Sequence, residues 1–172
     1  MTRPILALAP VLAALLALGA ACGSGAVTAA DLTAGDPART DAAVARLVEA
    51  GAAGTPLVGQ HPTADGELTA PPLVWAVLGG AGPEALGALL AAGVDVEAPD
   101  DRGATALIHA AGTREPAVVR LLFEAGADVD ARAADHQGVF DAARSNPVLK
   151  ADPLYAELVA AQTVGSRHSG AD

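Results

Sequence analysis

The sequence predicts an all-α solenoid of about four stacked helix pairs joined by extended connections. The 172-residue chain is 52% hydrophobic but only 2% aromatic, so its apolar residues are mostly Ala, Leu and Val, which suit closely packed helices. Similar segments recur at a regular interval along the chain, and proline and glycine take matching places at their ends. Each such unit is too small to enclose a core alone, and stacking makes the core continuous.

The composition excludes several classes of function. The net charge of −10, with no Lys/Arg run to reverse it locally, disfavours DNA or RNA as a partner. Cys22 is the single cysteine, and none of the four histidines pairs with another at metal-ligand spacing. The sequence has no nucleophile elbow, phosphate loop or zinc-protease motif. We therefore predict no catalytic residues, no metal, no cofactor and no small-molecule substrate.

Residues 1–21 are predicted to be a signal peptide for export. Arg3 gives a short positive start, and residues 5–21 are uncharged and mostly apolar. Small residues close this stretch, as they do at signal-peptidase cleavage sites. No further charge appears until Asp31.

The end of this segment, L-G-A-A-C at residues 18–22, resembles a bacterial lipobox. The resemblance implies a lipid attached to Cys22, cleavage before it, and a chain held at a membrane of the cell envelope by a tether over residues 22–30. Gly19 departs from the pattern, because Leu is commonest there. Two alternatives stay open: cleavage near residues 28–30, which gives a secreted or periplasmic soluble protein, and a retained helix at the short edge of the length that spans a bilayer.

The self-similar segments carry a family resemblance. Residues 92–98 (A-G-V-D-V-E-A) match residues 125–131 (A-G-A-D-V-D-A), and residues 72–76 (P-L-V-W-A) match residues 106–110 (A-L-I-H-A). Together with D-D-R-G-A-T-A-L-I-H-A-A at residues 100–111, they resemble the ankyrin repeat. The resemblance implies antiparallel helix pairs connected by projecting fingers.

Start and stop residues set the limits of the helix pairs. A proline suits the first position of a helix, and a glycine suits the position just after its end. The prolines are Pro83, Pro116 and Pro153, and the glycines are Gly51, Gly93 and Gly126. The predicted pairs are residues 29–34 with 41–50, 72–78 with 83–92, 105–112 with 116–124, and 139–144 with 153–161.

The repeats are predicted to occupy residues 31–162, and residues 163–172 are predicted to be a disordered tail. Residues 145–150 resemble the inter-helix loop of bacterial ankyrin C-terminal caps. The first finger, from Gly51 to Leu73, is longer than the later ones, which run from Gly93 to Leu107 and from Gly126 to Phe140. The extra residues fall within 52–70 and are predicted to form a long loop, either functional or merely tolerated.

The resemblance also assigns structural roles to three residues. Asp100 falls where ankyrin repeats use an aspartate to brace the finger turn by hydrogen bonds. His109 aligns with Trp75 at the variable position of the first helix. We expect the His109 side chain to pack against its neighbours or to lie at the surface, and the Trp75 side chain to pack against a neighbouring repeat. Neither is expected to bind a ligand or catalyse a reaction.

The family implies a protein partner, bound on the concave surface that finger tips and first helices form. The matching positions are predicted to be partner-binding: Glu67, Leu68, Ala70, Asp101, Arg102, Ala104, Gly112 and Thr113. Acidic fingers favour a basic partner. We therefore expect a protein-binding scaffold at the bacterial cell envelope, with protection or inhibition of an envelope protein as candidate roles. The alternatives are a structural or assembly lipoprotein without a dedicated site and, least favoured, an enzyme that uses His61 and Asp65 of the insert.

Overall fold

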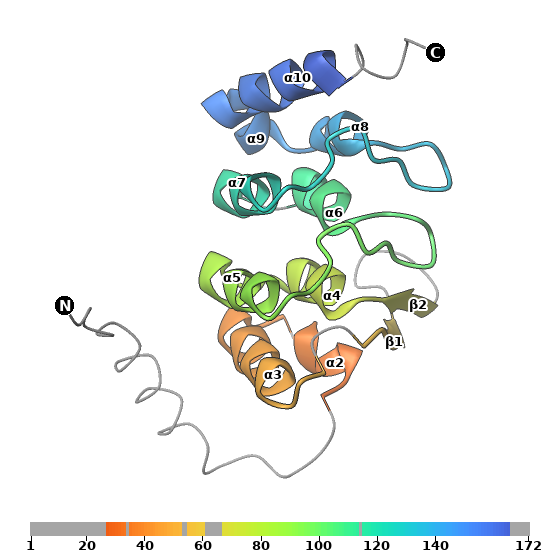
Figure 1. The fold of residues 1–172 in the computed structure, drawn as a ribbon, viewed down its shortest axis with the longest axis vertical. Helices are drawn as coiled ribbons and strands as arrows, with labels where there is room; N and C mark the ends of the chain where they lie inside the picture. Colours follow the sequence, from red (N-terminus) through yellow and green to blue (C-terminus); the bar gives the residue numbers. More distant parts are fainter. Residues whose placement is uncertain (1–26, 34, 53–54, 61–66, 114, 166–172) are drawn as a thin grey trace, which may run out of the picture.

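A computed structural model describes residues 27–33, 35–52, 55–60, 67–113 and 115–165 of the chain. The predicted signal peptide, Cys22 and most of the predicted tether lie outside the described residues. The described residues form a stack of helix pairs, with fingers that project to one side (Figure 1). First-row helices α2, α4, α6 and α8 pack in sequence, as do second-row helices α3, α5 and α7. The predicted helical solenoid is therefore confirmed in this part of the chain.

The helices begin and end close to the predicted limits in the middle of the chain. The first row consists of α2 (Ala29–Leu32), α4 (Pro72–Gly79), α6 (Ala106–Thr113) and α8 (Val139–Ala143). The remaining helices are α3 (Pro37–Glu49), α5 (Pro83–Ala91), α7 (Pro116–Glu124), α9 (Pro147–Ala151) and α10 (Pro153–Gly165). Helix α3 starts before its predicted beginning at Asp41, because Pro37 takes the first position and Asp36 caps the Ala38 N–H at 3.1 Å.

The glycines after the second-row helices end those helices as predicted. Gly93 has φ 82°, a left-handed conformation that strains any residue with a Cβ. The N–H of Val94 donates to the Leu89 carbonyl at 3.3 Å, and that of Gly93 donates to the Leu90 carbonyl at 3.0 Å. These two bonds satisfy carbonyls that the helix end leaves open, and they turn the chain into the next finger.

The ends of the repeat domain differ from the prediction. Ala29 and Ala30, assigned to the tether, belong to α2, because Thr28 and Asp31 form a capping box at its start. At the other end, α10 continues to Gly165 and so includes the first residues assigned to the disordered tail. Residues 166–172 lie outside the described part.

The segment predicted as an inter-helix loop forms helix α9 instead. The Asn146 side chain accepts from the Leu149 N–H at 3.1 Å, which is a helix cap. Its amide nitrogen also donates to the Ala111 carbonyl at 3.1 Å. The buried Asn146 therefore starts a helix and ties it to α6 at the same time.

The insert forms a β-hairpin rather than a structureless loop. Strand β1 (Leu57–Gln60) pairs antiparallel with β2 (Glu67–Ala70), with Leu57 opposite Ala70. Along β2, exposed and buried residues alternate, as expected for a strand with one face on the core. This hairpin is the departure from the all-α prediction among the described residues.

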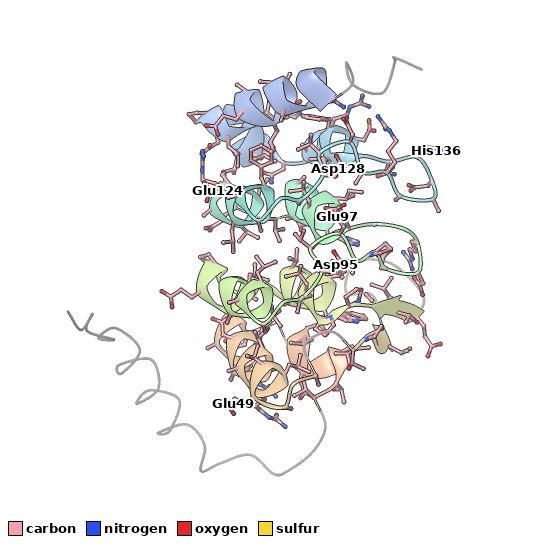
Figure 2. All side chains as sticks on the ribbon, in the orientation of Figure 1. Glu49, Asp95, Glu97, Glu124, Asp128 and His136 are labelled. Carbon is pink, nitrogen blue, oxygen red and sulfur yellow. The ribbon has the colours of Figure 1, made fainter. Side chains whose placement is uncertain are left out.

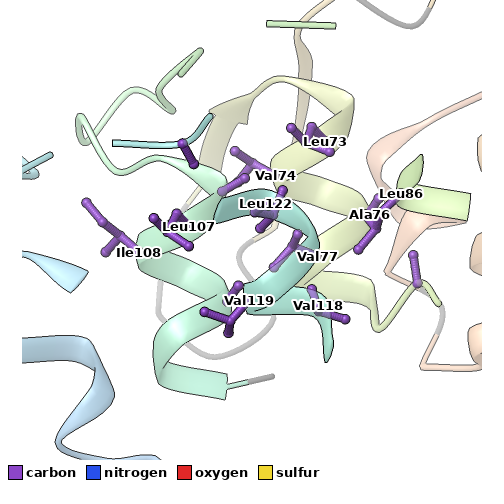
Figure 3. Packing of buried hydrophobic residues seen from close by; sticks show 14 of the residues in the cluster. Leu73, Val74, Ala76, Val77, Leu86, Leu107, Ile108, Val118, Val119 and Leu122 are labelled. Atoms are coloured by element: carbon purple, nitrogen blue, oxygen red, sulfur yellow. The ribbon is translucent and has the colours of Figure 1, made fainter. Parts of the chain in front are cut away.

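One apolar core runs through the stack. Figure 3 shows buried side chains from neighbouring helices in contact, among them Val77 of α4, Leu107 of α6 and Leu122 of α7. Each is 0% exposed. Burial of an aliphatic side chain of this size contributes about 1.5–3 kcal/mol, so the shared interfaces between pairs hold the stack together.

Candidate protein-docking groove

A groove of about 540 Å³ lies between the fingers and helices α6 and α8, on the concave side of the stack. We call it the α6–α8 groove and define it by its lining: Asp100, Arg102, Ala104, Ile108, His109, Gly112, Thr113, Ala133, Ala134, Asp135, Gln137, Ala142 and Ser145. Fingers 94–105 and 127–138 supply one wall, and the two first-row helices supply the other.

The finger wall is braced by the Asp100 carboxylate, as the resemblance implied. It accepts the N–H groups of Arg102 at 2.9 Å and Ala104 at 2.8 Å, and it meets Nε2 of His109 at 2.8 Å. Burial acts to raise the pKa of Asp100, but the hydrogen bonds from His109 and from the Ala104 and Arg102 amides outweigh it. The pKa of Asp100 is therefore lowered from its ordinary 3.8.

His109 stands at the inner edge of the groove. Its side chain is 15% exposed, and its Nε2 is held by the fully buried Asp100 side chain. Thr113 donates its hydroxyl to the His109 carbonyl at 2.8 Å. The imidazole therefore joins the finger to α6, which confirms the expected structural role.

Backbone bonds join neighbouring fingers into one wall. The N–H of Asp101 donates to the Thr69 carbonyl at 2.9 Å, and the Asp101 carboxylate accepts the Thr69 N–H at 2.9 Å. The next link is from the Ala134 N–H to the Arg102 carbonyl, at 2.8 Å. The wall of the groove is thus held at both fingers.

A further hydrogen bond joins the two fingers where they leave the second-row helices. The Glu97 carboxylate accepts the Asp128 N–H at 2.8 Å, and both residues lie at the base of the fingers in Figure 2. At the tip of the last finger, His136 adopts φ 64°. Successive repeats are therefore fixed to each other outside the core as well as within it.

The structure brings half of the predicted partner-binding residues together. Those that line the groove are Arg102, Ala104, Gly112 and Thr113, of which Ala104 is buried with 6% of its surface exposed. Glu67 is exposed on β2 but is not part of the lining. Asp101 is exposed, although its carboxylate is engaged by the Thr69 amide.

Leu68 and Ala70 were expected at the surface, and the structure corrects this expectation. They are 0% and 1% exposed, because alternation along β2 turns both side chains into the core. A partner cannot reach them in this conformation. The correction follows from the hairpin, since a loop would not have imposed the alternation.

Among the groove residues that were not predicted, three polar ones could have been found from the repeat. Asp135, Gln137 and Ser145 lie one repeat period after Arg102, Ala104 and Gly112, and all six line the groove. The repeat period was the available signal. The fourth copy of the repeat departs from the pattern in sequence, so the pattern did not assign groove residues to it.

Within the described residues, no helix has the length and apolar character needed to cross a membrane. The same residues contain no group of three or more His, Cys, Asp or Glu side chains that could hold a metal ion.

The fold and the groove define a helical-repeat solenoid with a concave surface. Residues 102–134 match the family model of the ankyrin repeat. Among solved structures, the chain is similar to the ankyrin repeat domain of Bcl-3, described as a unique member of the IkappaB protein family, with 25% identity and a TM-score of 0.48. That match covers 65% of this chain and 48% of the Bcl-3 chain. A search of curated proteins found no match. The chain thus contains an ankyrin repeat, a unit that serves generally as a protein-interaction scaffold.

Proposed function

We propose that this chain is a scaffold that binds a protein partner in the α6–α8 groove, at the bacterial cell envelope. The observation that carries the proposal is the convergence of Arg102, Ala104, Gly112 and Thr113 on one concave groove of about 540 Å³. These four positions are also ones that the sequence resemblance assigns to partner binding. A preformed groove between rigid elements lets a partner bind without an ordering cost on this side.

The hydroxyl groups in the groove favour binding over catalysis. Thr113 donates to the His109 carbonyl, and Ser145 donates to the Ala142 carbonyl at 2.8 Å. Neither hydroxyl is directed at the imidazole of His109, which would have to activate a nucleophile. The His109–Asp100 pair therefore supports the fold of the site, and the remaining surface is suited to contact.

The envelope location rests on the sequence alone. In our proposal, a lipid on Cys22 holds the repeats close to the membrane, since helix α2 begins at Ala29. Labelled palmitate supplied to the native host should enter the chain, and Cys22→Ala should abolish that label and release the chain from the membrane fraction. Label retained in the Cys22→Ala variant would contradict the anchor. Protection or inhibition of an envelope protein is the candidate role.

A photo-crosslinking amino acid tests the docking site directly. Placed at Gln137 in the groove, it should yield an adduct with one envelope protein in living cells. Placed at Ala88, an exposed position on α5 away from the groove, it should not. Asp135→Lys, which places a positive charge on the groove lining, should weaken the Gln137 adduct with a basic partner. Equal adducts from both positions, or none from Gln137 alongside envelope defects on deletion, would favour a structural lipoprotein without a dedicated site.

A further inference from the structure

Three equivalent positions on the concave side have different surroundings. Trp75 of α4, His109 of α6 and Ala142 of α8 follow one another at the repeat period and take the same place in successive first-row helices. In a repeat protein, equivalent positions report how one surface changes along the stack. The comparison shows where that surface is open.

At the first of these positions, the chain covers its own concave surface. Trp75 is 0% exposed, and its indole Nε1 donates to the Leu57 carbonyl of β1 at 3.0 Å. Gly59 lies against the ring, since a Cβ added there would be 3.2 Å from the indole and would overlap Ala29. The insert hairpin and Trp75 together fill this part of the concave face.

Between α6 and α8 the same face stays open because the side chains are small. Five of the thirteen lining residues have at most a methyl side chain: Ala104, Gly112, Ala133, Ala134 and Ala142. Of the two equivalent residues at this groove, His109 has the larger side chain, and its Nε2 is hydrogen-bonded to the Asp100 carboxylate at 2.8 Å. No large side chain of the described residues fills this groove, whereas Trp75 and the hairpin fill the concave face beside α4.

The charge around the groove favours a cationic occupant. Fingers 94–105 and 127–138 together carry seven acidic residues and two arginines, so they are acidic on balance although Arg102 lines the groove, and the whole chain has a net charge of −10. Asp135 on the lining is exposed, and its carboxylate accepts a hydrogen bond from the Gln137 amide at 3.0 Å. Complementary charge raises the rate of encounter and selects against acidic partners.

We propose that the α6–α8 groove receives one large apolar side chain, carried by a cationic extended segment of the partner, where the fold supplies no counterpart of Trp75 and the hairpin. This inference rests on the proposed function and specifies the chemistry of the partner. The groove lies between the third and fourth repeats, so the segment is held towards one end of the stack. An aromatic anchor in a pocket with a charged rim is a common arrangement at protein interfaces.

Three short blocked peptides separate the contributions of shape and charge: Lys-Lys-Trp-Lys-Lys, Lys-Lys-Ala-Lys-Lys and Glu-Glu-Trp-Glu-Glu. The cationic Trp peptide should shift the NMR methyl signals of Ile108 and Ala142, and it should bind at least about tenfold more tightly than either other peptide. Its affinity should fall as salt rises from about 0.05 to 0.5 M. Equal binding of the Ala peptide, or signal shifts confined to the hairpin, would overturn the proposal.

Variants that fill the groove provide the second test. Ala142→Trp should reduce the affinity for the cationic Trp peptide about tenfold. Thr113→Trp, at an exposed position on the rim, should do the same if Ala142→Trp folds poorly. Ala88→Trp on α5 is the size-matched control and should bind normally, with circular dichroism confirming the fold of each variant. Unchanged peptide binding by filled variants that fold would overturn the proposal of an anchored side chain. If the partner still crosslinks at Gln137 in those variants, the proposed function holds but the anchored side chain is excluded.

Discussion

The Asp100 carboxylate joins a finger turn to the first helix of its own repeat, and its replacement should be strongly destabilising. Asp100→Ala removes the acceptor of two backbone amides, one of them the buried Ala104 N–H. A buried donor left without its partner destabilises a protein by about 1–3 kcal/mol. Urea unfolding at neutral pH should show a loss of this size, whereas Asp135→Ala on the exposed finger should change little.

The same carboxylate makes the fold sensitive to acid. The pKa of Asp100 is lower in the folded chain than its ordinary 3.8, so its contribution to the free energy of unfolding is present above that value. The contribution is lost as the pH falls through the folded-state pKa. Between pH 7 and about pH 3, the natural chain should therefore lose more stability than Asp100→Asn. Parallel losses in the two proteins would show that Asp100 does not provide the linkage.

Two buried threonines differ in whether their hydroxyl groups are hydrogen-bonded, so their replacement should have different effects on stability. The Thr40 hydroxyl lies near three carbonyls, at 3.1 Å from Leu32, 3.2 Å from Asp36 and 3.2 Å from Gly79, and so links α2, α3 and α4. The buried Thr105 hydroxyl has no hydrogen-bond partner among the described residues.

Thr40→Val should therefore destabilise the chain by about 1–3 kcal/mol, because it removes a bonded buried hydroxyl. Thr105→Val should cause no loss, or a gain of up to about 1 kcal/mol, because the hydroxyl it removes is unsatisfied. Thermal and urea unfolding of both variants measure the difference. A larger loss from Thr105→Val than from Thr40→Val would be incompatible with the observed bonds.

At the scale of elements, the close contact between α2 and α4 depends on a glycine. Gly79 ends α4, and a Cβ added there would overlap the Leu32 carbonyl of α2. Gly87 lies within α5, and a Cβ added there meets nothing within 4 Å. The two positions test packing and helix propensity separately.

Gly79→Ala should destabilise the chain by about 1–3 kcal/mol or more, because backbone must move to accept the methyl group. Gly87→Ala should stabilise it by about 0.5–1 kcal/mol, because alanine restricts the unfolded chain and favours helix. Chemical unfolding of both proteins gives the comparison. If Gly79→Ala were neutral, the first and second helix pairs would have to be less tightly packed than the structure shows.

The sequence predicted the elements whose limits are set by local signals. Pro83, Pro116 and Gly93 fixed helix ends because each acts through its own backbone geometry. The hairpin could not be predicted that way. Its strands are held by Trp75 and by close packing of Gly59 on Ala29, contacts between segments that are distant in sequence. Helix α9 was missed for a related reason, since Asn146 is held from α6.

The candidate site was partly predictable, because its residues recur at the repeat period of the whole stack. Repeat spacing brought Arg102 and Thr113 to one surface, and the same spacing applied once more would have added Asp135 and Gln137. Which part of the concave face stays open could not be read from the repeat. It depends on where the insert lies against Trp75, a feature that the period does not contain.

The stack as a whole should lose stability unevenly, because each helix pair contacts only its neighbours. Leu107 of α6 is buried in the middle of the core, and Leu158 of α10 is buried at its end. Replacement of a buried Leu by Ala costs about 2–5 kcal/mol at either place. In a one-dimensional array, a central loss weakens two interfaces and a terminal loss weakens one.

Leu107→Ala should therefore lower the unfolding midpoint of the entire chain and raise amide hydrogen exchange in α4 through α8 together. Leu158→Ala should raise exchange mainly in α9 and α10, while α4 and α6 keep the protection of the natural chain. Hydrogen exchange followed by NMR or mass spectrometry resolves the two patterns. Uniform loss of protection with Leu158→Ala would show that the stack unfolds as a single cooperative core. The last helices adjoin the groove through α8. In a single cooperative core, their local unfolding would be too costly to affect docking.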